Sequence, residues 1–140
     1  MTNELSLTVR YCETDRMGIV HHSRYYPWFE MGRTAFFKQM GYSYGALEKE
    51  GVQLPLTETH CSYLKGACYE DELIIQTRLT ALTAARCEFS YTVLRADEKL
   101  AQGRTVHGFV DGQFRPIALK KKRPELWQEL AAVLWTDSEK

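Results

Sequence analysis

Chemically active side chains gather in one short stretch near the N-terminus, residues 11–25. This stretch holds the carboxylate of Asp15, then Gly18, then the pair His21 and His22, directly before a segment with the pattern of a helix. The first N–H groups of a helix lack acceptors and carry the positive end of the helix dipole, so a helix start attracts negative charge. A carboxylate held beside such a start is a candidate catalytic group for chemistry at a carbonyl.

The overall composition predicts a single globular domain over residues 1–140. The chain is 44% hydrophobic and 12% aromatic, and its formal net charge is +0, so its charge does not indicate binding to nucleic acid or to an anionic membrane. We find no apolar run long enough to span a bilayer. The N-terminus lacks the basic and apolar regions of a signal peptide, which makes the cytoplasm the expected location.

The cysteine and histidine spacings do not indicate a metal site. The four cysteines match no zinc or CxxC pattern, and reduced thiols are expected in a chain without a secretion signal. His60 and His107 fall inside predicted strands without acidic or cysteine partners at a ligand spacing, so we interpret them as ordinary sheet residues.

The segments around Asp15 predict a strand and then a loop. Residues 4–11 alternate polar and apolar side chains, which places Leu5, Leu7 and Val9 on one face, with Tyr11 continuing it. Residues 15–18 follow as a loop, in which Gly18 is the residue expected at a positive φ angle.

A long helix is predicted next, with Ser23 as its N-cap and Gly41 as its stop. Pro27 fits this helix only within the first turn, because an interior proline breaks a backbone hydrogen bond. Apolar or small residues recur at helical spacing and predict a largely buried helix: Tyr25, Trp28, Phe29, Gly32, Ala35, Phe36 and Met40.

After the long helix, Ser43 can cap a short helix over residues 44–50, which Gly51 ends. The hydrophobic period then changes to two, and short turns separate segments rich in Thr, Val, Ile, Tyr and Phe. The predicted strands are residues 52–65, 70–82, 85–95 and 100–110. An extended piece over 114–119, a solvated basic connector over 120–123 and a helix starting at Pro124 complete the chain.

This order predicts an α+β domain in which an antiparallel sheet wraps around one long central helix. A single sheet layer around one helix leaves its edge strands open. Pairing between the edges of two subunits is therefore expected.

The string over residues 14–25, continued by residues 29–33, resembles the hotdog-fold acyl-CoA thioesterases of the 4-hydroxybenzoyl-CoA thioesterase type, including the bacterial Tol-Pal-associated branch. That family shows an Asp, a Gly-containing step with two aliphatic residues, an aromatic–His or aromatic–Tyr pair, a Tyr, and later Glu and Arg on the helix. The chain departs from this pattern at His21, where the family commonly has an aromatic ring. The resemblance therefore leaves open whether His21 or His22 faces the ligand.

The resemblance implies a hydrolase that acts on an acyl-CoA substrate without a metal or cofactor, as a homodimer or homotetramer. In that family Asp15 would be the nucleophile or the general base. The backbone N–H of His22 would polarise the thioester carbonyl, with possible help from its imidazole, and Tyr11 would lie near the site. By family position, the substrate-binding residues would be Gly18, Val20, Tyr25, Arg86 and Arg115, with the two arginines facing the CoA phosphates.

Each of these residues also has a purely structural interpretation. Asp15 can cap a turn, His22 can cap or pack on the helix, and Tyr11 can be a strand residue that packs on the helix. Glu30 could form an acid–base pair with the site, but a local pairing with Arg33 or Thr34 is favoured.

Two other functions fit the same fold. A hotdog protein that binds acyl-CoA or an acyl carrier without turnover would keep the pocket but would not depend on Asp15. A dehydratase acting on a hydroxyacyl thioester ranks last, because the Asp–Asn–Pro type of loop that marks that branch is absent from the sequence.

Overall fold

A computed structural model of the chain describes residues 1–136, which form one antiparallel sheet and several helices. The strands are β1 (Asn3–Thr8), β2 (Leu56–Tyr63), β3 (Glu72–Leu82), β4 (Arg86–Arg95) and β5 (Glu98–Gly108). The α-helices are α1 (Tyr25–Gln39), α2 (Tyr44–Lys49), α3 (Leu119–Lys122) and α4 (Pro124–Ala132). Two 3₁₀ turns, η1 (Tyr11–Glu13) and η2 (His22–Arg24), lie between β1 and α1.

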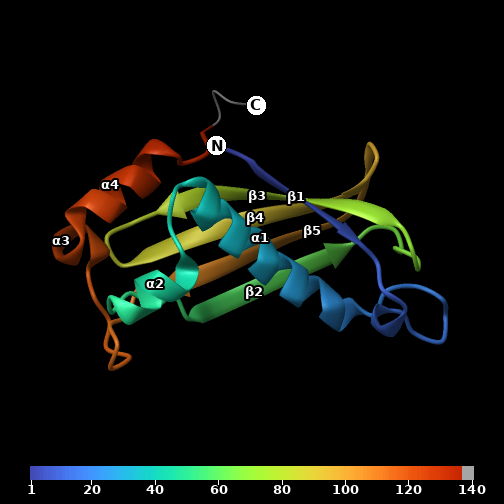
Figure 1. The fold of residues 1–140 in the computed structure, drawn as a ribbon, viewed down its shortest axis with the longest axis horizontal. Coiled ribbons are helices and arrows are strands. Elements are labelled where there is room, and N and C mark those ends of the chain that lie inside the picture. The colour runs from blue at the N-terminus through green and yellow to red at the C-terminus, as the bar shows by residue number, and fades with distance from the viewer. Residues whose placement is uncertain (137–140) are drawn as a thin grey trace.

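The sheet has the strand order β1-β3-β4-β5-β2, and every neighbouring pair is antiparallel (Figure 1). β1 and β2 are therefore its two edges. Short turns join β3 to β4 and β4 to β5, as the sequence predicts, whereas β2 crosses over to pair with β5.

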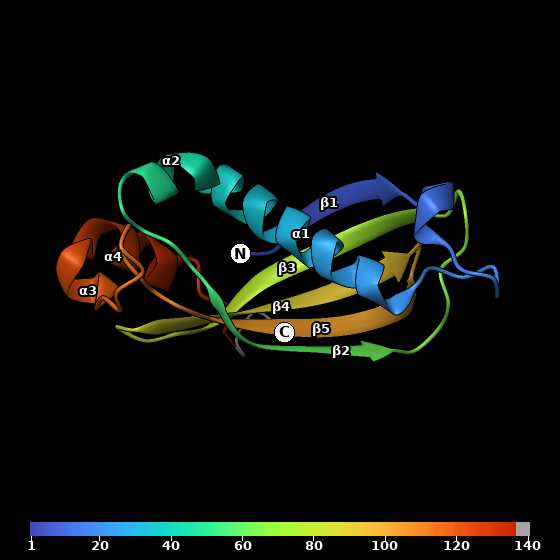
Figure 2. The ribbon, with the colours of Figure 1, turned by 90° about the horizontal axis from the view of Figure 1, so that it is seen from below.

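The sheet curves around α1, which lies against one of its faces (Figure 2). The interior between them is made of large apolar side chains that alternate along the strands and recur along the helix. The largest fully buried ones include Trp28, Phe29, Phe36, Phe37, Phe89 and Tyr91. Burial of each such side chain contributes about 1.5–3 kcal/mol. The predicted hotdog arrangement, an antiparallel sheet around one central helix, is confirmed.

Two glycines let α1 and the sheet approach closely. A Cβ atom at Gly32 of α1 would lie 2.4 Å from Oγ1 of Thr77 on β3. A Cβ atom at Gly103 of β5 would lie 2.4 Å from the ring of Phe29. Helix and sheet are thus in direct contact at both positions.

The strand before the site is shorter than predicted. β1 ends at Thr8, and Tyr11 lies in the η1 turn rather than on the strand face. The chain turns there because the Glu13 carboxylate accepts the Arg10 N–H at 2.8 Å, and the Glu13 N–H donates to the Arg10 carbonyl at 3.0 Å.

The start of the long helix also differs from the prediction. A 3₁₀ turn at His22 precedes α1, and its N-cap is His21, whose side chain accepts the Ser23 N–H, rather than Ser23 itself. Pro27 does lie in the first turn of α1, and Gly41 follows the helix at a φ of +96°.

Most of the later boundaries agree with the prediction. The Ser43 side chain caps α2, Gly51 follows α2 with a φ of +87°, and Pro124 opens α4. The predicted connector at 120–123 is instead mostly the short helix α3, and Arg123 forms an ion pair with Glu50 at 3.0 Å. Within residues 1–136, no helix is long and apolar enough to cross a membrane.

The expected pairing of Glu30 with Arg33 is wrong. Arg33 points inward, is 8% exposed, and donates from Nη1 to the Tyr91 hydroxyl at 3.0 Å. Glu30 is exposed and makes no hydrogen bond or ion pair within residues 1–136.

Candidate active site

A pocket of about 310 Å³ lies at the end of the molecule where α1 begins and β2 ends. It is lined by two predicted catalytic residues together with aliphatic and aromatic side chains. The lining residues are Asp15, Met17, Ile19, Val20, His22, Tyr25, Tyr63, Leu64, Lys65 and Gly66. A larger hollow of about 490 Å³ on the sheet includes Arg78, Thr80 and Arg104, but none of the predicted catalytic residues.

A tight loop holds Asp15 at this pocket. The backbone of Asp15 bonds to both sides of the loop: its N–H donates to the Ile19 carbonyl at 2.8 Å, and its carbonyl accepts the Gly18 N–H at 3.0 Å. Its Oδ1 accepts the Met17 N–H at 2.8 Å. Gly18 has the predicted positive φ, +83°, which lets the chain reverse within four residues. The Asp15 carboxylate is half-buried and keeps its second oxygen, Oδ2, without a partner among the described residues.

The start of the helical segment faces the same pocket. His22 is the first residue of η2, and its backbone N–H donates to no acceptor within residues 1–136. The side chain of His21 caps this turn, since its Nδ1 accepts the Ser23 N–H and lies 2.8 Å from the Ser23 hydroxyl. His22, not His21, is the histidine that lines the pocket.

Two tyrosine rings form a further part of the lining. Tyr25 and Tyr63 meet edge to face, with ring centroids 5.1 Å apart. The Tyr63 hydroxyl donates to the His22 carbonyl at 3.2 Å and thereby ties β2 to the helix start. Burial raises the pKa of both phenols, so both are neutral at physiological pH.

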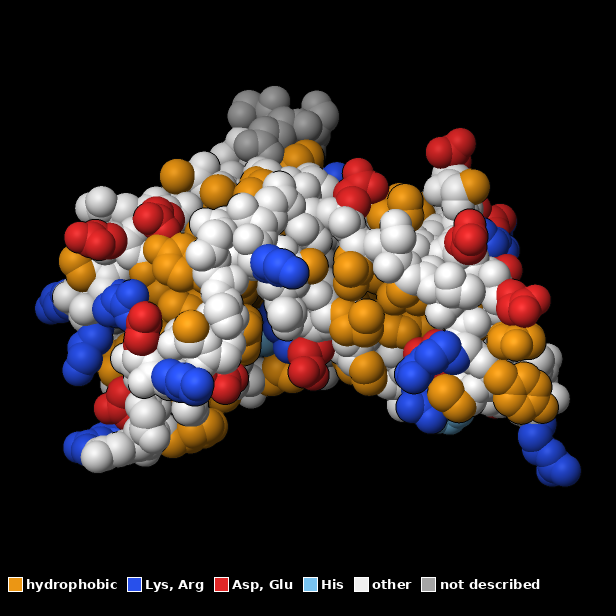
Figure 3. All heavy atoms as spheres, viewed as in Figure 1, with side chains coloured by type: hydrophobic (Ala, Val, Ile, Leu, Met, Phe, Trp, Pro, Cys, Tyr) orange, Lys and Arg blue, Asp and Glu red, His pale blue; other side chains and the backbone are white. Residues whose placement is uncertain are grey.

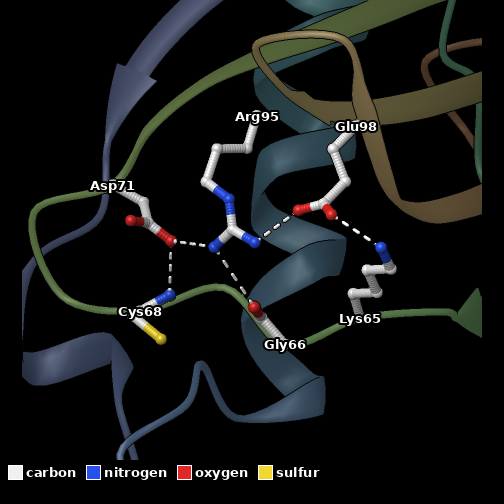
Figure 4. A network of polar contacts seen from close by, with 6 residues as sticks. All are labelled: Lys65, Gly66, Cys68, Asp71, Arg95 and Glu98. Carbon is white, nitrogen blue, oxygen red and sulfur yellow. Dashed lines mark hydrogen bonds and ion pairs between the residues drawn. The ribbon is translucent and has the colours of Figure 1, made fainter.

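The loop after β2 forms one wall of the pocket, and Figure 4 shows the polar contacts that hold it. The Arg95 guanidinium donates to Asp71 at 2.7 Å, to Glu98 at 2.5 Å and to the Gly66 carbonyl at 3.5 Å. Lys65 bonds to Glu98 at 2.6 Å. Arg95 and Glu98 stand at the ends of β4 and β5, so the sheet fixes the position of this wall.

The wall and the Asp15 loop are also joined directly. The Val20 N–H donates to the Ala67 carbonyl at 2.8 Å, and Ala67 is fully buried. Gly66 packs so closely on Ile19 that a Cβ atom would lie 2.7 Å from the Ile19 side chain. The arrangement therefore brings Asp15 and His22, whose backbone N–H has no acceptor within residues 1–136, to one small, mostly apolar space.

Comparison with known proteins decides the family. A family model described as the thioesterase-like superfamily matches residues 9–134. The chain belongs to the thioesterase-like superfamily. The predictions of a hotdog thioesterase relative and of a thioester hydrolase are confirmed at the level of this family.

Individual relatives of the thioesterase-like superfamily cover nearly the whole chain. The protein named putative acyl-CoA thioesterase YneP of Bacillus subtilis is 35% identical over 85% of this chain and 88% of its own length. Acyl-CoA thioesterase YbgC of Haemophilus influenzae is 26% identical over 87% of this chain and 93% of its own. A crystal structure of DHNA-CoA thioesterase from Staphylococcus aureus superposes with a TM-score of 0.89 at 27% identity, and the match covers 94% of this chain and 90% of that one.

Not every residue that the thioesterase resemblance implies reaches the pocket within one chain. Val20 and Tyr25 line it, and Gly18 shapes the loop between Met17 and Ile19. Tyr11 is 75% exposed and packs its ring edge to face on Tyr69, at 5.6 Å, outside the pocket lining.

The two arginines predicted at the CoA phosphates lie at the other end of the sheet. Arg86 begins β4, whereas Arg95, at the end of the same strand, contacts the pocket wall. Ten residues of extended chain separate these ends by about 30 Å. Arg115 follows β5 near Asp111, also away from the pocket.

Glu13, a buried carboxylate that holds the chain next to the pocket, was not identified from the sequence. Glu13 is 4% exposed and accepts the indole N–H of Trp28 at 2.9 Å as well as the Arg10 N–H. Burial raises the pKa of this carboxyl, but the hydrogen bonds from Arg10 and Trp28 outweigh burial and hold its pKa below the usual range. The Glu13 carbonyl also accepts the His21 N–H at 2.9 Å. Glu13 therefore fixes the position of the residue that precedes η2.

Residues 1–136 contain no group of three His, Cys, Asp or Glu side chains placed to bind a metal ion. The four cysteines are free, with Cys87 buried in the core and Cys12 and Cys68 exposed.

Proposed function

We propose that the protein is an acyl-CoA thioesterase that hydrolyses a CoA thioester to the free acid and CoA. The observation that carries this proposal is the pocket shared by Asp15 and His22, whose backbone N–H has no acceptor in the described chain. The names of the relatives YneP and YbgC support the same substrate class.

In the proposed reaction the thioester oxygen accepts the His22 N–H, which stabilises the negative charge that develops on that oxygen. Loss of one such donor typically lowers kcat about 10²–10³-fold. The imidazole of His22, whose ring centroid lies 4.1 Å from that of His21, can assist as a second polar group at the same oxygen.

Asp15 supplies the second requirement of the reaction. As a general base it takes a proton from water while the water oxygen bonds to the carbonyl carbon. The C–S bond then breaks, and the sulfur leaves as the CoA thiol after it receives that proton. As a nucleophile, the carboxylate would instead form a mixed anhydride, which water cleaves in a second step. Both routes consume one water and need no metal or redox cofactor.

The proposal includes a homodimer that pairs through β2. This edge strand is largely exposed, and Leu56 and Tyr63 at its two ends are 51% and 45% exposed. An exposed edge with apolar side chains is a site for strand pairing. Antiparallel pairing of two β2 strands about a two-fold axis would place the start of β2 in one copy beside the end of β2 in the other.

That pairing also accounts for the distant arginines. β4 runs parallel to β2 with only β5 between them, so Arg86 lies at the same end of the sheet as Leu56. In the proposed dimer, Arg86 of the second copy approaches the first copy's pocket to within a few strand spacings of about 4.8 Å. Each site would then combine Asp15 of one copy with cations of the other for the CoA phosphates.

The dimer is expected to show twice the chain mass in sedimentation equilibrium across a hundredfold range of protein concentration. A Thr59→Pro substitution in β2 removes a backbone donor from this strand and is expected to lower the mass toward that of one chain. Apolar surface on the face that carries α1 (Figure 3) offers a second contact through which two dimers could form a homotetramer. A monomer in the wild type at all concentrations would contradict the dimer.

The activity is tested by thiol release from acyl-CoA esters, followed with a thiol-reactive chromophore. We expect turnover of at least one ester in a set that spans short, long and aromatic acyl groups. Tight acyl-CoA binding in calorimetry without thiol release from any ester would contradict hydrolysis and favour a binding protein without turnover.

A further inference from the structure

Glu13, two residues before Asp15, is a buried carboxylate that takes no part in the proposed reaction steps. Both of its oxygens accept hydrogen bonds: Oε1 accepts the Arg10 N–H at 2.8 Å, and Oε2 accepts the Trp28 indole N–H at 2.9 Å. These bonds hold the pKa of the carboxyl below its usual range against the effect of burial. A buried charge is stable only where such bonds satisfy it, so the two donors fix the place of this carboxylate.

Trp28 ties the carboxylate of Glu13 to the interior of α1. The indole is 2% exposed, and its ring packs on that of Tyr25 with centroids 4.9 Å apart. Tyr25 in turn lines the pocket. The bond between Glu13 and Trp28 therefore joins the chain before Asp15 to the close-packed part of the helix.

The backbone of Glu13 makes a second link to the helical segment. Its carbonyl accepts the N–H of His21 at 2.9 Å, and the next residue is His22, whose N–H has no acceptor within residues 1–136. Asp15 follows two residues later along the same loop. Glu13 is thus linked to the positions of both groups of the proposed reaction, the Asp15 carboxylate and the His22 N–H.

An exposed bond joins the same two segments less firmly. Arg24 donates from Nη2 to the Cys12 carbonyl at 3.2 Å, where both groups also meet water. A bond in contact with water contributes little to the position of its partners, whereas one in the low-dielectric interior is stronger. The buried bond between Glu13 and Trp28 is therefore the stronger constraint on the loop.

The distance between Asp15 and His22 matters for chemistry at a carbonyl. Reacting groups must approach to about 3–3.5 Å, and a misplacement of about 1 Å can lower the rate about 10²-fold. Asp15 lies in a loop and His22 begins the helical segment, so contacts between these two parts of the chain must set their separation.

We infer that Glu13 is a positioning residue, which through its bond to Trp28 holds the Asp15 loop at a fixed distance from the start of the helical segment. The inference rests on the proposed thioesterase activity. Glu13 does not line the pocket and touches no reacting atom, so it acts through Asp15 and His22. Its loss should lower kcat and leave KM nearly unchanged.

Glu13→Gln is the first test. The amide keeps the shape of the side chain, but its NH₂ group replaces one acceptor oxygen and faces one of the two N–H donors, Arg10 or Trp28. We expect kcat for acyl-CoA hydrolysis, per folded protein, to fall at least about tenfold, with KM within about twofold of the wild type. A wild-type kcat in the folded variant would overturn the inference.

Glu88→Gln is the matched control. Glu88 is a half-buried carboxylate of β4 that accepts hydrogen bonds from Arg104 and Thr80, each at 3.0 Å, outside the pocket lining. The same change from carboxylate to amide should leave its kcat within about twofold of the wild type. An equal loss of kcat in Glu88→Gln and Glu13→Gln would show a general effect on the fold and overturn the positioning role.

A double variant tests whether the two residues act through their shared bond. Trp28→Phe removes the indole donor but keeps an aromatic ring in the core, and it should lower kcat about three- to tenfold. Combined with Glu13→Gln, it should add little, because the bond is already broken. A fall equal to the product of the two single effects would show independent action and overturn the inference.

Backbone NMR gives a measurement that does not depend on activity. Glu13→Gln and Trp28→Phe should each shift the amide resonances of Asp15 and His22, and Glu88→Gln should not. If the wild type releases thiol from no ester, hydrolysis is contradicted, and these resonances alone decide the positioning role. Asp15 and His22 resonances that stay unchanged in both variants would overturn it.

Discussion

Replacing Asp15 with asparagine is expected to lower kcat for acyl-CoA hydrolysis about 10²–10⁴-fold, the range in which a positioned acid–base group contributes. Asparagine has nearly the same shape, and its side-chain oxygen can still accept the Met17 N–H that Oδ1 accepts at 2.8 Å. The loop geometry is therefore retained, while the negative charge and the proton acceptor are lost. In the proposed mechanism the carboxylate acts on the reacting atoms, so KM should change much less than kcat.

Asp97→Asn is the matched control for this substitution. Asp97 is exposed in the turn between β4 and β5, outside the pocket lining, so the same change of charge there should leave kcat within about twofold of the wild type. Circular dichroism and thermal unfolding would verify that both variants are folded. A folded Asp15→Asn protein with the wild-type kcat would refute the proposed role of Asp15 and, with it, the mechanism.

The fold could be predicted because the hydrophobic period and the positions of the stop and turn residues agree along the chain. The period of two in Leu5 and Leu7, the helical spacing of Trp28 and Phe36, and the stops at Gly41 and Gly51 are local signals, and each corresponds to an observed element. The boundaries at the site were predicted least well. There, the turn at Tyr11 depends on Glu13, and the cap by His21 depends on the tautomer of its own ring, neither of which the spacing of residues encodes.

The site could be predicted only where it is continuous in sequence. Asp15, Val20, His22 and Tyr25 are close along the chain, and the structure brings all four to one pocket. The other wall comes from residues 63–66, some forty positions away, and its placement depends on the pairing of β2 with β5. No local pattern marks Tyr63 as a pocket residue, because an exposed tyrosine at a strand end is common in any sheet.

Arg86 and Arg115 show a different limit of sequence reasoning. Their expected role came from position in the family and was not accompanied by a prediction of which copy would supply them. One chain places Arg86 at the far end of β4, about 30 Å from the end that contacts the pocket wall. Arg115 also lies outside the pocket lining. Their proposed role in binding CoA therefore depends on the proposed β2 dimer.

A row of hydrogen-bonded polar side chains crosses the core below α1. Arg33 donates to the Tyr91 hydroxyl at 3.0 Å, which lies 2.6 Å from the Thr105 hydroxyl. The Thr105 hydroxyl in turn lies 2.8 Å from Nε2 of His107. Nδ1 of His107 lies 2.9 Å from the Leu54 carbonyl, which can only accept, so Nδ1 carries the proton and Nε2 is an acceptor.

Every donor in this row then points the same way, from Arg33 to His107. A second proton, on Nε2 of His107, would remove the acceptor of the Thr105 hydroxyl. Burial and, to a lesser extent, the charge of Arg33 lower the pKa of His107 to about 4, although the hydrogen bond to the Leu54 carbonyl acts in the opposite direction. Three other titratable groups share this part of the core with Arg33. Burial raises the pKa of each, so that all three are neutral: Cys87, Tyr44 and Tyr91. No carboxylate is hydrogen-bonded to Arg33 or His107 within residues 1–136.

Stability is therefore expected to fall as the pH falls below 6.5. In the unfolded chain His107 takes up a proton near its ordinary pKa of 6.5, whereas the folded protein resists protonation until about pH 4. The unfolded state thus binds more protons between these values, and the free energy of unfolding should decrease by about 2 kcal/mol from pH 7 to pH 5 on account of His107. The full contribution, about 3 kcal/mol, is present above pH 6.5 and lost by pH 4.

Urea unfolding at pH 7, 6 and 5, at one ionic strength and one protein concentration, measures this decrease. The range above pH 5 avoids most of the titration of Glu13, Glu98 and Asp111, whose pKa values lie below the usual range in the folded protein. His107→Asn removes the titrating ring and should flatten the dependence, although it lowers stability at pH 7 by leaving Thr105 without its acceptor. His60→Asn, at an exposed position of β2, should keep the wild-type dependence. If His107→Asn and the wild type lost the same free energy of unfolding between pH 7 and pH 5, His107 would not be the source of the pH dependence.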